Sequence, residues 1–295
     1  MRRMPLLGGV LVPMLTPIME DDTLDLEGVQ NLGAHLLASD SVNGLFAIGA
    51  TAEFLHLSIH ERMALMEKFA TVPKGEKIIT VNIGGLPYDQ MIELARFSER
   101  LKLDAVAMSV PVEIEPTTAS VVSYFKRIAG LGIPFLVYWT PMAKNHAPTP
   151  EIVAELMKFE NFVGLKDSSR DMVAFTTIAA AYGDEISVLQ GVEMLHLASL
   201  AVGSAGIVGG GLNLYPGLPA QTTRCFMAGD FDQAKALQLR TNESWDTLKQ
   251  VGTFRSFCKQ YWKNEGVIKG VHCRAENGET CTEQQLAELQ RLADL

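Results

Sequence analysis

One lysine occupies a position from which it can act as a nucleophile. Lys166 closes the apolar run 162–166, in the segment Asn161-Phe-Val-Gly-Leu-Lys-Asp-Ser-Ser169. Lysine is almost never fully buried without a partner, and burial lowers its pKa, which leaves a neutral amine able to attack a ketone. The product is a Schiff base, an electron sink for making or breaking the adjacent carbon–carbon bond. The competing interpretation is a lysine that turns outward and pairs with Asp167.

Two other segments carry groups suited to the same chemistry. Small residues in Gly49-Ala50-Thr51-Ala52-Glu53 let the backbone approach a ligand, and its N–H groups with the Thr51 hydroxyl would form a carboxylate or phosphate cradle. An ordinary turn is the alternative. Tyr138 ends the apolar run 134–138, where its hydroxyl can relay a proton or simply face water at a rim.

Other patterns are less informative. The triple glycine 209–211 offers a phosphate loop, which keeps a phosphosugar enzyme as an alternative, or room for a substrate chain. His56 and His60 are four residues apart without an H-E-x-x-H pattern, so we expect a surface pair and no metal site. The acidic cluster 20–22 is typical of a solvated turn. Lys144, Asn145 and His146 follow Tyr138 and are candidates to line the mouth of the site.

The elements that must position these residues alternate between short apolar runs and amphipathic segments. Strands are expected at 9–14, 44–48, 77–83, 105–109, 134–138, 162–166, 186–190 and 206–209. Helices are expected near 26–39, 58–70, 88–101, 117–129, 150–158, 170–182, 192–202 and 217–228. Ser58-x-x-Glu61 predicts a capping box, and Thr149–Pro150 predicts a capped helix start.

The strands are apolar along their whole length, which indicates parallel strands covered on both faces. We therefore predict an α/β fold, a (β/α)8 TIM barrel over residues 1–229. A doubly wound sheet is the competitor, but it would usually show G-x-G-x-x-G after its first strand. Helical patterns at 230–250, 253–264 and 282–293 predict a C-terminal helical extension over 230–295. In such barrels the chemistry lies at the C-terminal ends of the strands.

Composition excludes several classes of partner. The 295 residues carry 25 Lys and Arg against 34 acids, a net charge of -9. So acidic a chain lacks the basic face that nucleic acid or an anionic membrane requires. The four cysteines form no C-x-x-C pair, which favours reduced thiols and a cytoplasmic location. Arg2 and Arg3 before the apolar run Leu6–Leu15 resemble a signal peptide, but Pro13 interrupts the run and no cleavage pattern follows, so we expect a buried strand.

The order of three motifs resembles the dihydrodipicolinate synthase/N-acetylneuraminate lyase family, the class I pyruvate-dependent aldolases. These motifs are G-x-T-x-E at 49–53, Y-x-x-P at 138–141 and G-L-K-D-S-S at 164–169, and the resemblance extends over essentially the whole chain. It implies that Lys166 forms the imine without a separate cofactor and that Tyr138 shuttles protons. It also implies a homotetramer.

The same resemblance implies a pyruvate site. Thr51, with the flanking amides of Ala50 and Ala52, would hold the pyruvate carboxylate. Gly191 and Val208 would lie around the rest of the pyruvate.

Three departures from the family pattern bear on the substrate. Ala50 stands where the family usually has Thr or Ser, and Pro111-Val112-Glu113 stands where the synthases carry a tyrosine pair. Met142-Ala143-Lys144 stands where the synthases place an arginine for the second substrate. We therefore expect an aldolase or lyase acting on a 2-keto-3-deoxy sugar acid or related 2-oxo acid. A synthase, a dehydratase using the same lysine and a non-catalytic 2-oxo acid-binding protein are the alternatives.

Overall fold

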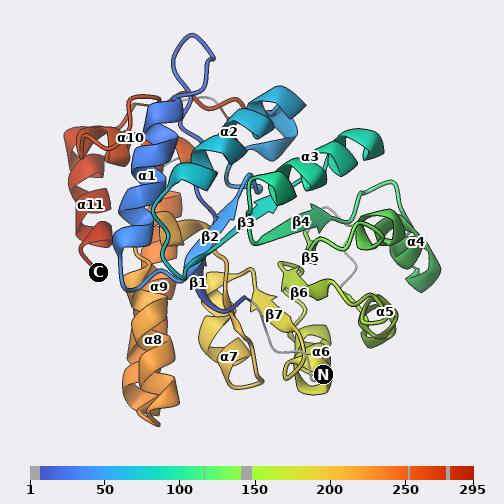
Figure 1. Ribbon diagram of the computed structural model, residues 1–295. Helices are drawn as coiled ribbons and strands as arrows, with labels where there is room; N and C mark the ends of the chain where they lie inside the picture. Colours follow the sequence, from blue (N-terminus) through green and yellow to red (C-terminus); the bar gives the residue numbers. More distant parts are fainter. Residues whose placement is uncertain (1–6, 116, 141–147, 252, 277–279) are drawn as a thin grey trace.

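Eight parallel strands close into a barrel in chain order, which confirms the predicted TIM barrel (Figure 1). The computed structural model describes residues 7–115, 117–140, 148–251, 253–276 and 280–295. The strands are β1 (Gly9–Val12), β2 (Gly44–Ala47), β3 (Ile78–Asn82), β4 (Ala105–Ser109), β5 (Phe135–Trp139), β6 (Phe162–Asp167), β7 (Ser187–Gln190) and β8 (Gly206–Ile207). All eight lie within about two residues of their predicted positions. The first apolar run is thus a buried strand, whereas Arg2 and Arg3 lie outside the described residues.

Helices follow the strands and cover the outside of the barrel. They are α1 (Leu26–Ala38), α2 (Ile59–Thr71), α3 (Tyr88–Arg100), α4 (Thr118–Ala129), α5 (Pro150–Leu156), α6 (Met172–Tyr182), α7 (His196–Leu200) and α8 (Gly217–Met227). The Ser58–Glu61 capping box and the Thr149 cap with Pro150 are both present. The helix expected over 192–202 is instead a 3-10 turn, η2 (Glu193–Leu195), followed by the short α7. None of the helices among the described residues is both long and apolar enough to span a bilayer.

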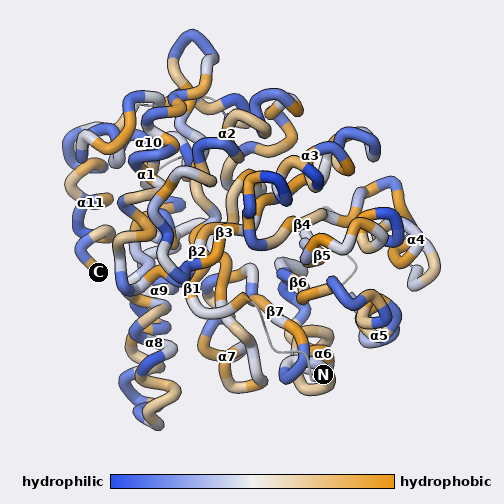
Figure 2. The backbone as a smooth tube through the Cα atoms, in the orientation of Figure 1, coloured by the Kyte–Doolittle hydropathy of each residue, from blue (hydrophilic) through white to orange (hydrophobic). Residues whose placement is uncertain are grey.

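Hydrophobic residues are concentrated along the strands (Figure 2), and apolar side chains fill both faces of the sheet. The residues inside the barrel are Leu7, Leu11, Phe46, Ala107, Leu136, Tyr138, Leu189 and Val208. A larger cluster lies between the strands and the surrounding helices. Tyr138 and Lys166 are paired in register on neighbouring strands, near the C-terminal ends where we expected the chemistry.

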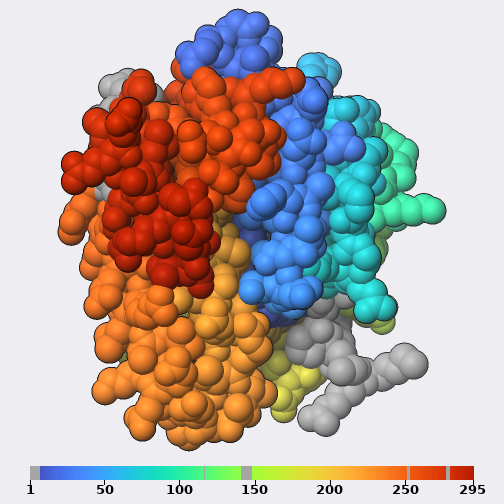
Figure 3. Space-filling model, turned by 90° about the vertical axis from the view of Figure 1, so that its left-hand side faces the viewer, coloured from blue at the N-terminus to red at the C-terminus, as the bar shows by residue number. Residues whose placement is uncertain are grey.

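Three helices follow α8: α9 (Phe231–Val251), α10 (Phe254–Asn264) and α11 (Glu283–Ala293). Figure 3 shows α10 and α11, in orange-red and red, beside the blue α1. The contact includes the rings of His35 and Trp262, whose centroids are 4.8 Å apart. The division of the chain at residue 229 stays a prediction, but these helices do not stand apart, because α10 also reaches the loop that follows β2.

Candidate active site

Lys166 points into the barrel rather than outward. Its side chain is only 4% exposed, and Nζ lies 4.3 Å from the ring centroid of Phe46 and 4.1 Å from that of Tyr138. Burial lowers its pKa to about 7, although the nearby Glu193 acts to raise it. Asp167 forms no ion pair with it among the described residues and is not among the groups that shift its pKa; the Asp167 carboxylate instead accepts a hydrogen bond from the Ser169 backbone at 2.7 Å. The geometry therefore favours the inward interpretation, with a neutral amine available near pH 7.

Tyr138 is buried in the same space, and its hydroxyl has a hydrogen-bond partner. Burial raises the pKa of Tyr138 to about 12, while a hydrogen bond with the Ser168 side chain and the positive charge of Arg255 oppose that rise. The phenol is therefore protonated at neutral pH. Ser168 comes two residues after Lys166 in the G-L-K-D-S-S motif, but its type and spacing alone did not assign it a function.

The loop after β2 has its carbonyl oxygens turned toward other parts of the protein. The oxygens of Ile48, Ala50, Ala52 and Phe54 accept hydrogen bonds from the side chains of Asn82, Arg255, Thr16 and Arg62, respectively. By contrast, the N–H groups of Ala50 and Thr51 have no acceptor among the described residues. Free N–H groups beside a hydroxyl are the arrangement that binds a carboxylate. The N–H groups of Ala50 and Thr51 are therefore available to bind a carboxylate, whereas the Ala52 N–H donates to the Gly49 carbonyl at 3.0 Å, and the cradle stays a prediction.

Glu53 attaches this loop to the C-terminal extension. Its carboxylate forms a fully buried ion pair with Lys259 at 2.7 Å and accepts the backbone N–H groups of Arg274 and Ala275 at 2.6 and 2.7 Å. Burial opposes ionisation, yet Lys259 and the two backbone hydrogen bonds keep the pKa of Glu53 below its usual value. The extension thus helps to fix the loop conformation.

Gly191 follows β7, the strand next to the one that carries Lys166, and Val208 follows β8, one strand further round the barrel. The Gly191 N–H donates to the Asp167 carbonyl at 2.7 Å, and the Val208 N–H donates to the Gln190 carbonyl at 2.8 Å. A side chain at Gly191 would collide with Ser168, because its Cβ would come 2.0 Å from Oγ. Gly191 therefore leaves the space that the Ser168 hydroxyl occupies.

Glu193 is a residue of the site that the sequence interpretation missed. Its side chain is 3% exposed, and Oε1 has no hydrogen-bond partner among the described residues. Burial raises its pKa to about 7, while hydrogen bonds from the N–H groups of Gly211 and Leu212 and the charge of Lys166 act to lower it. The only signal in the sequence is an acid two residues after Gly191.

The triple glycine serves this carboxylate. A Cβ at Gly209 would lie 2.2 Å from Glu193 Cγ, and one at Gly211 would lie 2.0 Å from the Tyr215 hydroxyl. The turn η3 (Gly210–Asn213) brings the N–H groups of Gly211 and Leu212 near the Glu193 carboxylate, where they act to lower its pKa. The anion-binding amides that would suit a phosphate thus already face a carboxylate of the protein.

The segment 111–113, where the resemblance leads us to look for a tyrosine pair, borders a mostly apolar cavity of about 580 Å³. Glu113 lies near Tyr124, whose pKa it helps to raise, and is not among the groups that shift the pKa of Tyr138. The cavity reaches Ser109, the register partner of Tyr138.

The remaining candidates lie elsewhere. His56 ends η1 (Phe54–His56) whereas His60 belongs to α2, so the two exposed histidines do not share a helix. The acidic cluster 20–22 is exposed, as expected of a solvated turn. Residues 142–146, which include Lys144, Asn145 and His146, lie outside the described residues.

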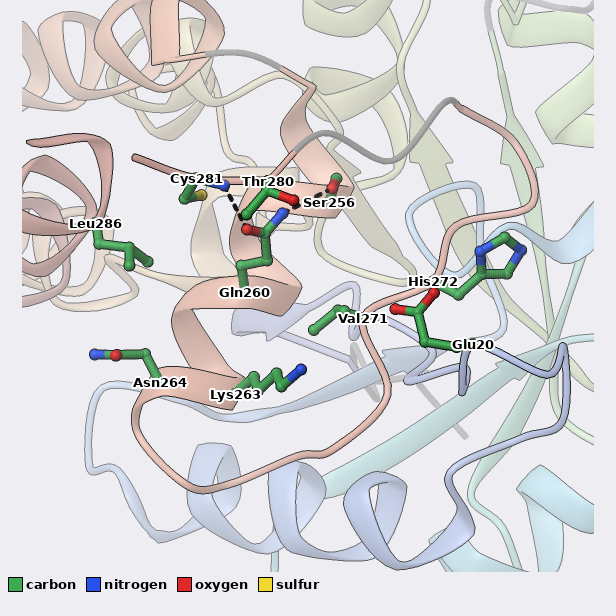
Figure 4. Close-up of a pocket in the computed structure, with 10 residues that line it drawn as sticks. All are labelled: Glu20, Ser256, Gln260, Lys263, Asn264, Val271, His272, Thr280, Cys281 and Leu286. Carbon is green, nitrogen blue, oxygen red and sulfur yellow. Dashed lines mark hydrogen bonds between the residues drawn. The ribbon is translucent and has the colours of Figure 1, made fainter. Parts of the chain in front are cut away.

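A larger cavity, of about 700 Å³, lies in the C-terminal extension and is separate from the strand ends (Figure 4). Gln260 lies at its wall, where it donates to Ser256 Oγ at 3.1 Å and accepts from the Cys281 N–H. None of the site residues described above lines it. The larger cavity is therefore not the catalytic candidate.

Curated relatives cover most of the chain. A 4-hydroxy-tetrahydrodipicolinate synthase of Methanoculleus marisnigri is 29% identical over 232 residues, 78% of this chain and 79% of that protein. A protein of the same name from Archaeoglobus fulgidus is 27% identical over 241 residues, 81% of this chain and 82% of the other.

Solved structures share the fold. N-acetylneuraminate lyase from Fusobacterium nucleatum has a TM-score of 0.88 at 19% identity and covers 97% of this chain and 98% of its own. Dihydrodipicolinate synthase from Bacteroides thetaiotaomicron has a TM-score of 0.87 at 23% identity and covers 98% and 99%. The model of the Dihydrodipicolinate synthetase family matches residues 6–294, so this chain belongs to that family of pyruvate-dependent class I lyases, which act through a lysine Schiff base.

Proposed function

We propose that this protein is an aldolase or lyase that joins or separates pyruvate and an aldehyde through an imine on Lys166. The observation that carries this proposal is the buried Lys166 amine, with a pKa of about 7, beside the Tyr138 hydroxyl. A neutral amine is the nucleophilic form, and the covalent imine replaces one difficult step by two easier ones. The lysine supplies the electron sink, so no separate cofactor or metal is required.

The roles of the surrounding residues follow from their positions. The N–H groups of Ala50 and Thr51 and the Thr51 hydroxyl hold the pyruvate carboxylate, with Ala52 closing the loop behind them. Val208 and Gly191 border the methyl and carbonyl end. Fixing the carboxylate brings C2 toward Lys166, and such positioning accounts for much of the rate of a two-reactant step.

Proton transfer to the substrate hydroxyl is assigned to Tyr138. The Tyr138 hydroxyl donates its proton to the substrate oxygen when the carbon–carbon bond forms. When the bond breaks, it accepts the proton of the substrate hydroxyl while it passes its own through the nearby Ser168 to water. Positioned acid–base groups contribute about 10²–10⁴ in rate. This arrangement supports a catalytic protein over a 2-oxo acid-binding protein without activity.

We favour a 2-keto-3-deoxy sugar acid or related 2-oxo acid as the substrate of cleavage. Hydroxyl and carboxyl groups of Ser168 and Glu193 lie around Lys166 and suit a hydroxylated chain. Synthase activity remains the alternative that the curated relatives' names suggest, and a dehydratase would use the same imine. A phosphorylated sugar is disfavoured, because Glu193 occupies the amides of the loop after β8.

Two experiments test this function. Borohydride reduction in the presence of pyruvate should give an adduct that peptide mass spectrometry assigns to Lys166, and the Lys166→Arg variant should give none. Turnover with a panel of 2-keto-3-deoxy acids, monitored by release of pyruvate, then identifies the substrate. An adduct on another lysine, or none on the folded protein, would contradict the proposal.

We also propose a cytoplasmic homotetramer. The four cysteines are all free, which suits a reducing compartment. Leu55 and Val112 are 51% and 45% exposed and border the same apolar cavity, which suits a surface covered by another copy. Light scattering gives the mass, and Val112→Asp should shift it toward smaller species if this surface is an interface.

A further inference from the structure

Glu193 is a buried acid that the mechanism above uses only as part of the substrate surroundings. We propose that Glu193 is a second catalytic acid–base group, which protonates the oxygen that leaves as water when Lys166 forms its imine. This inference rests on the proposed function, because it requires pyruvate to react at Lys166.

The positions of the two side chains allow this transfer. Lys166 and Leu189 are register partners on β6 and β7, and Glu193 follows four residues after Leu189, at the same end of the barrel. Glu53 and Lys259 form a buried ion pair, but no such pair joins Lys166 to Glu193 among the described residues. The amine is therefore not held as an ammonium by a contacting carboxylate.

The carboxylate is fixed but incompletely satisfied. The N–H groups of Gly211 and Leu212 lie near enough to lower its pKa, whereas Oε1 is buried without a partner among the described residues. Buried carboxylates with a purely structural function normally have their oxygens hydrogen-bonded. Gly209 also leaves space for the carboxyl group, since any Cβ there would come 2.6 Å from Oε1. We assign this oxygen, which has no partner among the described residues, to the leaving oxygen of the substrate.

The step balances with one proton. The neutral amine of Lys166 adds to C2 of pyruvate, and a proton passes from nitrogen to oxygen to give a neutral carbinolamine. Protonated Glu193 then donates its proton to the carbinolamine hydroxyl, the carbon–oxygen bond breaks, and water leaves. The products are the positively charged imine, one water and the Glu193 carboxylate, whose charge stabilises the imine. Hydrolysis reverses each transfer.

The other titratable groups near Glu193 do not compete for this proton. Tyr215, which follows η3, and Cys258 on α10 both feel the Glu193 charge, and burial raises the pKa of each. Both are neutral near pH 7. Lys166 on β6 is the cation that acts on Glu193. The pH dependence of imine formation should therefore reflect the coupled titration of Lys166 and Glu193.

The test compares the wild-type protein with Glu193→Gln, which keeps the shape of the side chain but carries no acidic proton. The rate at which pyruvate forms the Lys166 adduct is measured across neutral pH with borohydride in excess. The wild-type rate should pass through a maximum near neutral pH. Glu193→Gln should be about 10²-fold slower and should lose the fall on the alkaline side. The matched control Glu113→Gln, in the separate apolar cavity, should keep the wild-type rate and profile.

A folded Glu193→Gln variant with the wild-type rate and pH profile would overturn the inference. Should that variant fail to fold, Glu193→Asp keeps the charge but withdraws it by one methylene, and it should slow the adduct about tenfold while keeping the bell-shaped profile. An unchanged rate in Glu193→Asp would equally overturn it. If the wild-type protein forms no adduct, the proposed function itself fails, which is a distinguishable result.

Discussion

The Ser168 side chain lies beside the Tyr138 hydroxyl and acts to lower its pKa, two residues beyond Lys166 on the neighbouring strand end. The Ser168 N–H donates to the Trp139 carbonyl at 2.9 Å, which ties the end of β6 to that of β5. Its Oγ packs where a side chain at Gly191 would otherwise lie. The hydroxyl that Ala50 lacks thus has a counterpart on the strand that carries Lys166.

Removing this hydroxyl should impair proton transfer. We expect Ser168→Ala to lower turnover about 10- to 100-fold, because Tyr138 loses the group with which it exchanges a proton. Borohydride trapping of pyruvate on Lys166 should continue, which separates the effect from loss of folding or binding. Ser169→Ala is the matched control, since the described contacts of Ser169 are with Asp167 and Asp171 and not with Tyr138. Equal activity in the two variants would contradict this role.

Tyr138 should matter far more than the exposed acid Glu113. Tyr138→Phe should lower turnover by about 10²-fold or more while Lys166 still traps pyruvate. Glu113→Gln should cost less than about tenfold, a barrier change near 1.4 kcal/mol, because Glu113 lies by Tyr124 rather than Tyr138. Steady-state kinetics of the two variants decide the question. A comparable loss in both would mean that Glu113 takes part in the relay.

The acid side of the pH profile should report Lys166. Its pKa is lowered to about 7, chiefly by burial, so the amine is protonated and unreactive below that pH. The rate of adduct formation should therefore fall about tenfold for each unit of pH well below 7. Stopped reactions with pyruvate and borohydride measure this rate. A profile that stays flat to well below pH 7, or one that rises only above pH 9, would contradict the lowered pKa.

The sequence predicted the barrel from its strand pattern and singled out the two central residues as candidates, whose roles came from the family resemblance. Each strand is a short run of apolar residues without alternation, and that pattern holds only where both faces of a sheet are covered. Lys166 and Tyr138 each close such a run, so the barrel rule for strand ends placed them together before any geometry was known. In the structure Tyr138 and Lys166 are register partners on β5 and β6, which confirms that they lie side by side.

The rest of the site depends on contacts between distant segments. Glu193 was expected inside a helix over 192–202, but Gly209 and the amides of Gly211 and Leu212 give its carboxylate a buried position. Arg255 reaches Ala50 from the extension, 205 residues away. Residue type and spacing do not show which distant segments come into contact, so these residues can be identified only from the three-dimensional structure.

The contribution of the Thr51 hydroxyl to binding the pyruvate carboxylate should be measurable as a change in pyruvate affinity. Thr51→Val removes the hydroxyl while keeping the shape of the side chain. One hydrogen bond to a charged group contributes roughly 1.5–3 kcal/mol, so pyruvate affinity should fall about 10- to 100-fold. Isothermal titration with pyruvate measures this change. Thr71→Val, an exposed change at the end of α2, serves as the control. Unchanged affinity in Thr51→Val would rule out the role.

The ion pair between Lys259 and Glu53 should be a large contributor to the unfolding free energy and to loop order. Removing one partner of a buried pair leaves the other charge uncompensated, so Lys259→Met should destabilise the protein by about 3–5 kcal/mol. Urea unfolding monitored by circular dichroism measures the loss. Lys269→Met, in an exposed pair with Glu27, should leave the unfolding midpoint unchanged. The double variant Lys259→Met with Glu53→Gln should recover part of the loss, since no buried charge then remains.

The same pair gives the pH dependence of stability a definite sign. The folded-state pKa of Glu53 lies below 4.5, so the unfolded chain binds this proton more readily than the folded protein. The stabilisation is therefore fully present above pH 4.5 and is lost as the pH falls through the folded-state pKa. The Lys259→Met variant should show a smaller loss of stability over this acidic interval than the wild-type protein. Parallel acid unfolding curves for the two proteins would show that Glu53 does not titrate as the buried pair requires.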